Sequence, residues 1–351
     1  MTRTSRLAAL TAMAGIAAVA LAGCGTTEVE TPSTDEASAD VSATCADDTT
    51  TTSTGPVTIT DQLGRTVELD EPAKRVVVLE WQEVEDVLSL CVNPVGVADP
   101  EGYSTWVSAE ELPEGTADVG QRGEPDLDSI YALDPDLIIV EAFTADDEQL
   151  KKLEEGDVPV LATVGADSDG QIDNMKTVFS TIAEALGRSD RADQILDEFD
   201  AYLADAKEQL ADSDAAGEEF LYIDGWLESG NLSIRAYGEG ALFTELGAEL
   251  GLKPVWTSDL EAEYGDGGVN NEYGLSQIDV ESLTAIGDAM IIYANDGAEE
   301  NYVTELEKNE VWQSLPAVQE DRAYAFPPNV WGAGGPRSVM QAIDGYVEIL
   351  S

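Results

Sequence analysis

Arginine is the side chain in this sequence best suited to chemistry with a ligand, because the chain contains no histidine. Histidine is the commonest general base and metal ligand in proteins, and the usual partner of a nucleophilic serine or cysteine. The sequence also lacks a Gly-x-Ser-x-Gly pattern and a complete phosphate-binding loop. We therefore expect a binding protein and not an enzyme, and keep an extracytoplasmic enzyme as a remote alternative.

Positive charge is scarce, which makes individual arginines informative. The chain has 17 Lys and Arg against 71 Asp and Glu, a formal net charge of −54. This charge argues against nucleic acid or an anionic lipid surface held by a basic patch. Arg122, Arg235 and Arg337 lie in glycine-containing segments, where a guanidinium could offer a planar fork of donors to anionic oxygens. The alternative for each is a surface salt bridge with one of many carboxylates.

The elements that would position these arginines follow an α/β pattern. Residues 57–60 and 67–69 alternate around a turn and predict a β-hairpin. Val84, Val87, Leu88 and Cys91 are spaced as on one face of a helix. Continuous apolar runs predict strands buried on both faces, as in a parallel sheet. These runs are 75–79, 95–97, 137–140 and 158–161.

Helical periodicity continues from Ile172 to Leu210, broken at Gly187, and the second of these helices would be about 30 Å long. The α/β alternation then resumes and repeats the first half, since 125–130 leads into 136–140 as 278–283 leads into 288–293. We therefore predict two Rossmann-like α/β lobes joined by a long backbone helix. A cleft between two lobes is a favoured place for a ligand.

The N-terminus has the layout of an export signal. Arg3 and Arg6 precede an apolar stretch at 7–21, and the tetrad Leu-Ala-Gly-Cys ending at Cys24 resembles the lipobox of bacterial lipoproteins. The resemblance implies cleavage before Cys24, a lipid on its thiol, and a location on the extracytoplasmic face of the cell membrane. The alternative is an ordinary signal peptide with a chance cysteine. The expected divisions are a signal peptide at 1–23, a flexible tether at 24–56, an N-terminal lobe at 57–171, a helical linker at 172–211 and a C-terminal lobe at 212–351.

The two other cysteines are expected to pair after export. In an oxidising compartment, Cys45 and Cys91 would form a disulfide that pins the end of the tether to the first lobe. The alternative is two free thiols, with Cys91 buried as a small hydrophobe.

Several segments together resemble the iron-siderophore substrate-binding proteins of ABC importers, above all the ferric-hydroxamate and ferric-dicitrate binders. The resemblance extends over residues 57–351, and Cys91 stands where that family usually has glycine. It implies two rigid lobes with a shallow cleft between them. The segments that carry it are 75–81, 95–107, 118–128, 234–238 and 334–338.

The resemblance also implies which side chains hold the ligand. Arg122 matches the arginine that reaches the iron-bound oxygens in the ferric-hydroxamate binders, and Arg235 and Arg337 are further candidates. Aromatic walls suit a siderophore, which has an apolar backbone around a polar metal centre; the alternative for a tryptophan is a core position. The aromatic candidates are Trp81, Trp106, Trp331 and Phe143, with Tyr103, Trp226 and Tyr237 as weaker ones.

Two acidic residues occupy equivalent places in the internal repeat. Asp128 and Glu281 each fall in the first turn of a predicted helix, where an acid stabilises the helix N-terminus. The resemblance implies a second role, in which one exposed carboxylate on each lobe docks against a permease subunit.

The sequence thus predicts a lipid-anchored monomer that captures a preformed ferric siderophore and delivers it to a permease dimer. It would have no resident cofactor or metal and would not ligate the iron itself. The siderophore class is left open among hydroxamate, citrate-type and catecholate. Cobalamin and haem are the alternative ligands, and haem is disfavoured because there is no histidine to ligate it.

Overall fold

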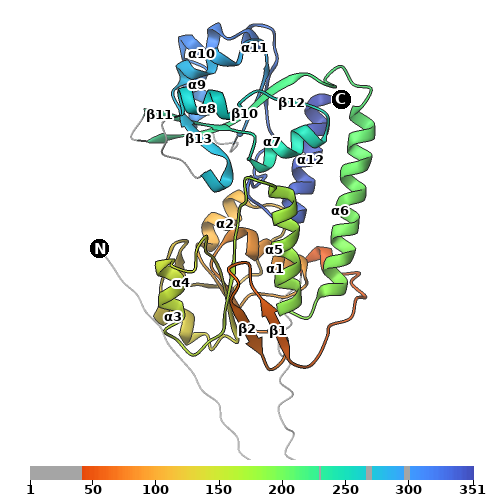
Figure 1. The fold of residues 1–351 in the computed structure, drawn as a ribbon, viewed down its shortest axis with the longest axis vertical. Coiled ribbons are helices and arrows are strands. Elements are labelled where there is room, and N and C mark those ends of the chain that lie inside the picture. Colours follow the sequence, from red (N-terminus) through yellow and green to blue (C-terminus); the bar gives the residue numbers. More distant parts are fainter. Residues whose placement is uncertain (1–41, 229–230, 266–270, 296–300) are drawn as a thin grey trace, which may run out of the picture. The chain divides into compact units, whose positions relative to one another are not determined.

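The computed structural model describes residues 42–228, 231–265, 271–295 and 301–351 (Figure 1). The expected signal peptide at 1–23, the lipidated Cys24 and the expected tether as far as residue 41 lie outside the described residues. All described residues belong to one unit, Ala39–Ser351. Within them, no helix is long and apolar enough to cross a membrane.

The first lobe begins with the predicted hairpin, which is confirmed. Strands β1 (Val57–Thr60) and β2 (Thr66–Leu69) pair antiparallel, with Val57 opposite Leu69. The Asp61 carboxylate holds the turn by accepting hydrogen bonds from the backbone N–H of Leu63 at 3.1 Å and of Arg65 at 2.8 Å.

A five-stranded parallel sheet forms the centre of the first lobe, in the order β5-β4-β3-β8-β9. The predicted buried strands are all present, because runs of Val, Ile and Leu fill both faces of a sheet covered by helices. Strand β9 begins at Val160, two residues later than predicted, and Pro159 before it has no N–H for a ladder hydrogen bond. The strands are β3 (Val76–Val78), β4 (Gly96–Val97), β5 (Ala117–Asp118), β8 (Leu137–Glu141) and β9 (Val160–Thr163).

Helix α1 (Trp81–Ser89) connects β3 to β4, and it is shorter than predicted. Cys91 lies beyond the helix end with a φ of 64°, so its spacing from Leu88 does not reflect a helical position. A left-handed residue after a helix is where glycine is favoured, which explains why the resembling family has glycine there. Cys91 instead forms a disulfide bond with Cys45, and their Cα atoms are 5.6 Å apart.

The second lobe contains a six-stranded mixed sheet in the order β13-β11-β10-β14-β15, with β12 also paired to β10. Its parallel part, β12-β10-β14-β15, repeats the order β4-β3-β8-β9 of the first lobe, as the sequence repeat predicts. The difference is that β10 extends into an antiparallel hairpin with β11, to which β13 is added. The strands are β10 (Glu219–Glu228), β11 (Asn231–Tyr237), β12 (Lys253–Pro254), β13 (Leu275–Ile278), β14 (Met290–Tyr293) and β15 (Ala323–Ala325).

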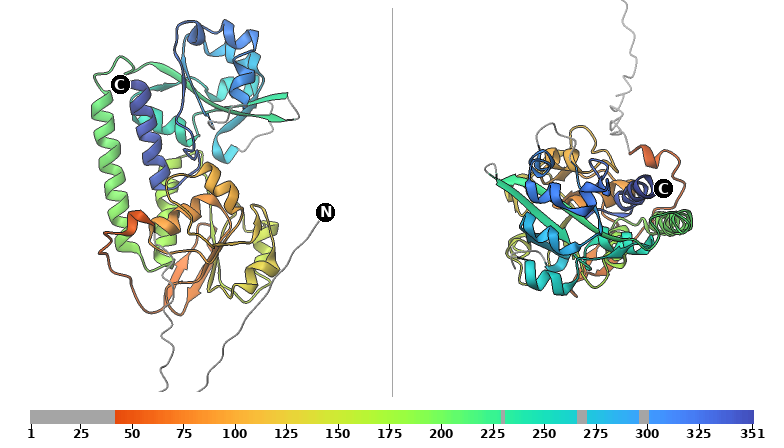
Figure 2. Two further views of the ribbon diagram at one scale, coloured as in Figure 1. Left: turned by 180° about the vertical axis from the view of Figure 1, so that it is seen from behind. Right: turned by 90° about the horizontal axis from the view of Figure 1, so that it is seen from above.

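Three helices link the lobes: α5 (Gln171–Ala185), α6 (Ser189–Leu210) and α12 (Pro336–Leu350). Helix α6 has 22 residues; it packs Ile195 into the core of the first lobe and Phe199 into that of the second. Helices α6 and α12 lie side by side in both Figure 1 and Figure 2. The predicted long backbone helix is therefore present, with two further helices beside it.

The remaining elements are short. Helix α3 precedes β8, and its counterpart in the second half, η3, is a 3₁₀-helix. The α-helices are α2 (Pro100–Trp106), α3 (Leu127–Ala132), α4 (Glu148–Leu153), α7 (Leu242–Glu249), α8 (Ser258–Tyr264), α9 (Tyr302–Leu306), α10 (Glu310–Ser314) and α11 (Pro316–Gln319). The 3₁₀-helices are η1 (Ala43–Cys45), η2 (Asn271–Tyr273) and η3 (Val280–Ile286), and a two-strand ribbon is formed by β6 (Gly120–Gln121) and β7 (Glu124–Pro125).

Residues 42–56 differ from the flexible tether that their composition predicts. The Arg188 guanidinium forms an ion pair with Asp48 and donates to the Thr52 hydroxyl at 3.0 Å, and Arg191 donates to the Thr44 carbonyl at 3.0 Å. Composition predicts flexibility because the segment has little to bury, but two buried arginines at the start of α6 and the disulfide at Cys45 connect it to the folded part of the chain.

Candidate ligand-binding site

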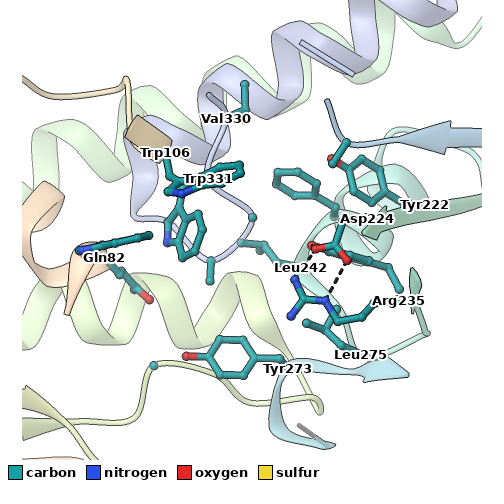
Figure 3. A pocket seen from close by; sticks show the side chains of 18 of the residues that line it. Gln82, Trp106, Tyr222, Asp224, Arg235, Leu242, Tyr273, Leu275, Val330 and Trp331 are labelled. Atoms are coloured by element: carbon teal, nitrogen blue, oxygen red, sulfur yellow. Dashed lines mark hydrogen bonds and ion pairs between the residues drawn. The ribbon is translucent and has the colours of Figure 1, made fainter. Parts of the chain in front are cut away.

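A cavity of ≈ 510 Å³ lies between the two lobes and is lined by residues of both (Figure 3). Nine aromatic residues line it, and four of the six tryptophans of the chain are among them. Aromatic walls and a few polar groups are typical of a small-molecule site. The aromatic lining residues are Trp81, Trp106, Trp226, Trp331, Tyr222, Tyr237, Tyr273, Tyr302 and Phe243.

Arg122 enters the cavity from the first lobe, at the tip of the β6–β7 ribbon. Gln121 pairs with Glu124, so Arg122 and Gly123 form a two-residue turn, and the positive φ of 77° falls on Gly123, the third position of the turn, where glycine is favoured. The guanidinium forms an ion pair with Glu80 and lies over the ring of Trp81, 3.7 Å from its centroid. The fixed turn and the stacking hold a positive group at the cavity wall.

Trp331 completes the surroundings of this arginine from the loop between β15 and α12. Its ring centroid lies 5.5 Å from the Arg122 guanidinium and 5.0 Å from the Trp81 ring, in an edge-to-face arrangement. Arg122 therefore lies beside two indoles that contact each other and belong to different lobes.

Arg235 enters from the second lobe, where strand register decides its neighbours. Asp224 of β10 is directly opposite Arg235 of β11. The Asp224 carboxylate accepts a hydrogen bond from Arg235 Nε at 2.8 Å and a second from Nη2, and it also accepts one from the Tyr237 hydroxyl at 3.0 Å (Figure 3). Burial opposes the charge on Arg235, but the bonds and charge of Asp224 raise its pKa, so the guanidinium stays protonated. Its Cζ lies 5.2 Å from the ring centroid of Trp226.

Glu141 is the third acidic group of the cavity and joins the lobes. It ends strand β8 and accepts a hydrogen bond at 2.6 Å from the hydroxyl of Tyr273, which belongs to η2 of the second lobe. Burial, and then the nearby charge of Glu80, raise the pKa of Glu141 above the ordinary value.

The structure brings seven of the ten sequence-predicted ligand residues together in this cavity. Trp81 is buried, Trp331 is partly buried, and both line the cavity wall. Trp81 is therefore a core residue and a wall residue at once. Trp106 and Trp226 are among the most exposed large hydrophobic residues. The seven are Arg122, Arg235, Trp81, Trp106, Trp226, Trp331 and Tyr237.

The other three do not line the cavity. Tyr103 is fully buried, and its hydroxyl donates to the Glu110 carbonyl at 2.8 Å, so it belongs to the core under α2. Phe143 packs behind the cavity wall, with its ring centroid 5.9 Å from that of Tyr273. Arg337 points instead toward α6, where it pairs with Glu198 at 3.1 Å. The salt-bridge alternative therefore describes Arg337.

The carboxylates of the cavity are the main residues that the sequence analysis missed. Asp224 could have been found from the hairpin: Glu228 pairs with Asn231 around the dipeptide at 229–230, and counting outward from that pair places Asp224 opposite Arg235. Glu80 follows the buried strand β3, and Glu141 is the last residue of the buried strand β8. Ligand-facing residues gather at the carboxyl ends of parallel strands, so the places of Glu80 and Glu141 in the sequence could have identified them.

Asp128 and Glu281, the candidates for permease docking, are both exposed. The N-terminus of α3 is capped by Asp126, whose carboxylate accepts a hydrogen bond from the Ser129 N–H at 3.0 Å. Helix capping therefore does not require Asp128.

The side chains that line the cavity are suited to holding an organic ligand. Within the described residues, no group of three or more His, Cys, Asp or Glu side chains is arranged to bind a metal ion. The lining offers guanidinium, phenol and amide donors in an aromatic frame. These groups favour an organic ligand with an apolar body and oxygen acceptors.

The chain is similar to known proteins in sequence and in fold. A sequence profile of the periplasmic binding proteins matches residues 76–330. The putative ABC transporter substrate-binding lipoprotein YhfQ of Bacillus subtilis is 28% identical over 84% of this chain and 86% of its own length. The Fe(3+)-citrate-binding protein YfmC of the same organism is 29% identical over 78% of this chain and 79% of its own.

Among solved structures, the Fe3+–Desferal bound siderophore binding protein FhuD of Vibrio cholerae superimposes with a TM-score of 0.66 at 26% identity. The match covers 79% of this chain and 97% of that one.

Proposed function

Because the chain belongs to the periplasmic binding protein family, we propose that it captures a ferric siderophore in the cavity between its lobes and delivers it to an ABC importer. Relatives named for ABC transport, for Fe(3+)-citrate and for a Desferal-bound siderophore support this function. The proposal is for binding without catalysis, so the protein would not be an enzyme.

One observation carries the proposal: each lobe presents an arginine stacked on tryptophan to the same cavity. In a ferric siderophore, oxygens polarised by the metal lie at the centre and an apolar backbone surrounds them. Guanidinium donors suit those oxygens, and indole and phenol rings suit the backbone. The protein would bind the preformed complex and leave the coordination of iron to the siderophore, with no resident cofactor.

The cellular setting is proposed with the function. Lipidation at Cys24 would hold the protein on the extracytoplasmic face of the membrane, as the lipoprotein names of relatives support. The exposed Asp128 and Glu281 would contact the two permease subunits, one from each lobe. The protein would act as a monomer.

Tryptophan fluorescence tests the proposal, because four tryptophans line the cavity. The purified protein is titrated with a ferric hydroxamate, ferric citrate, a ferric catecholate and cobalamin, with each iron-free siderophore as the control. Saturable quenching by a ferric complex, and weaker quenching by its iron-free form, is the expected result. Quenching by cobalamin alone, or by none of the four, would overturn the proposed ligand.

A further inference from the structure

Both arginines of the cavity are already paired with carboxylates of the same chain. Asp224 takes two hydrogen bonds from Arg235 and one from Tyr237, so its charge is directed at the guanidinium and not at the open cavity. Glu80 forms the corresponding ion pair with Arg122. The pairing is built into the fold, because Asp224 and Arg235 are opposite each other in the strand register.

The pairs do not remove the arginines as hydrogen-bond donors. The Arg122 and Arg235 side chains keep 33% and 35% exposure, against 17% and 14% for Glu80 and Asp224. A guanidinium has five N–H donors, and a single carboxylate leaves several of them unused. The cavity therefore offers directed donors without a net positive charge.

A third carboxyl group makes the net charge of the cavity lining more negative. Glu141 adds a third carboxyl, and within the described residues no lysine lines the cavity. Burial raises the pKa of Glu141, so this carboxyl is neutral at mildly acidic pH and negative in more basic solution. The lining thus ranges from neutral to negative.

The net charge of the whole chain also disfavours an anionic ligand. The formal net charge of the chain is −54, and a field of this sign repels anions approaching from solution. Salt weakens this long-range effect but not the contacts inside the cavity.

From these charges, and resting on the proposed function, we infer that Glu80 and Asp224 are specificity-determining residues that restrict the cavity to neutral or cationic ferric complexes. Each hydroxamate carries a single negative charge, so the three that surround Fe(III) leave a neutral complex, and a pendant ammonium makes it cationic. Catecholate and citrate ligands carry more negative charge and leave the ferric complex anionic. The structure therefore assigns the site to hydroxamate-type complexes.

The first measurement compares ligands on the unaltered protein. Dissociation constants are measured by fluorescence quenching at one ionic strength, about 0.15 M, for ferrioxamine B (cationic), ferrichrome (neutral), ferric citrate and ferric enterobactin (both anionic). We expect at least one hydroxamate complex to bind about tenfold or more tightly than either anionic complex.

The second measurement removes the neutralising carboxylates. Asp224→Asn and Glu80→Gln keep the shape and an acceptor oxygen at each position while freeing the charge of Arg235 or Arg122. We expect each to strengthen binding of an anionic complex relative to ferrichrome by about tenfold. Glu320→Gln is the matched control, since it removes a carboxylate paired with an arginine, Arg322 at 2.9 Å, outside the cavity. It should leave the ratio unchanged.

The outcomes separate this inference from the proposed function. An anionic complex that binds the unaltered protein as tightly as the tighter-binding of the two hydroxamate complexes would overturn the charge selectivity while the proposed function stands. If no ferric complex binds, the proposed function fails. A thermal melt checks the folding of each variant. If Asp224→Asn does not fold, the ligand ratio of Glu80→Gln alone tests the inference. A folded variant with the ligand ratio of the unaltered protein would also overturn the inference.

Discussion

Arg122 has surroundings that few surface arginines share. A guanidinium in water exchanges one set of hydrogen bonds for another when it binds a ligand, so the net gain is small. Here the guanidinium stacks on the Trp81 indole at 3.7 Å, the Trp331 ring lies beside it at 5.5 Å, and the Glu80 carboxylate orients it. Desolvation and fixed orientation both raise the contribution of the remaining donors to binding.

Replacing this side chain should therefore weaken ligand binding without unfolding the protein. We expect Arg122→Ala to lower the affinity for the ferric complex by about 1.5–3 kcal/mol, the range for hydrogen bonds to a charged group. The measurement is the dissociation constant from fluorescence quenching. Arg337→Ala is the control, because Arg337 pairs with Glu198 outside the cavity, and it should bind normally. Equal affinity in both variants would remove Arg122 from the site.

At the scale of elements, helix α1 is unusual because all nine of its residues are buried, three acidic side chains included. Glu85 accepts hydrogen bonds from the N–H of Ser338, at 2.8 Å, and from its hydroxyl, both in the first turn of α12. Asp86 lies beside Glu85, and in the described part of the chain neither of its carboxylate oxygens has a hydrogen-bond partner. Burial raises the pKa of Glu83, Glu85 and Asp86.

These buried acids should make the protein more stable in mildly acidic solution. Burial raises the pKa of Glu85 from 4.5 to about 7; the Ser338 hydrogen bonds oppose the shift and the Glu110 charge adds to it. The folded state therefore binds a proton that the unfolded state releases above pH 4.5. The stability from this proton is complete below that pH and is lost as the pH rises to about 7.

Glu85→Gln tests the pH dependence, because the amide keeps the shape of the side chain and does not titrate. We expect the variant to gain on the order of 3 kcal/mol in the free energy of unfolding at about pH 8 and little at about pH 4.5. Thermal or urea unfolding at both pH values gives the difference. Glu71→Gln, which removes an exposed acid, should follow the unaltered protein. A Glu85→Gln protein with unchanged pH dependence would contradict the buried-proton argument.

The C-terminal end of the same helix yields a separate prediction. The Cys45–Cys91 bond spans a sequence separation of 46, and removing it should lower stability by about 4 kcal/mol in the loop-entropy model. Cys91 has a φ of 64°, where glycine is favoured over other residues. We therefore expect Cys45→Ser/Cys91→Gly to be about 1 kcal/mol more stable than Cys45→Ser/Cys91→Ala in urea unfolding. The reverse order would show that the left-handed turn depends on the disulfide.

At the scale of the whole molecule, the sequence was sufficient for the fold because the fold depends on local patterns. The apolar runs that became β3 and β8 are buried on both faces, and the repeated segments became β8 and β14. The cavity depends on which residues of distant elements meet. Trp81 and Trp331 are 250 positions apart in the sequence and come into contact only after the lobes are joined.

The positions of the predicted residues that do not line the cavity have the same cause. Tyr103 and Trp106 are on one short helix, but only Trp106 faces the cavity, and Tyr103 turns inward to the Glu110 carbonyl. Arg337 lies in a glycine-rich segment as expected, yet α12 directs it toward Glu198 of α6. Residue type and sequence motif pointed to arginines and aromatic residues as candidates. Only the packing of the elements decides which of them face the cavity.

The proposed delivery to the importer would be a property of the whole molecule, because the proposed docking uses one contact from each lobe. Asp128 of α3 and Glu281 of η3 are exposed at equivalent places in the two halves. We expect Asp128→Lys/Glu281→Lys to bind the ferric complex normally but to support less than about a tenth of the uptake of the unaltered protein, since like charges at an interface suppress docking by several kcal/mol. Binding is measured by fluorescence quenching and uptake with radioactive iron in cells.

The control for this prediction carries the same change in charge elsewhere. Asp193 and Asp197 are exposed on α6, and Asp193→Lys/Asp197→Lys should support normal uptake. Loss of ligand binding in the Asp128/Glu281 variant would show that these acids are needed for the folding of the lobes, and would contradict a role in docking alone. Equal loss of uptake in both variants would show that net charge, and not the position of the two acids, governs delivery.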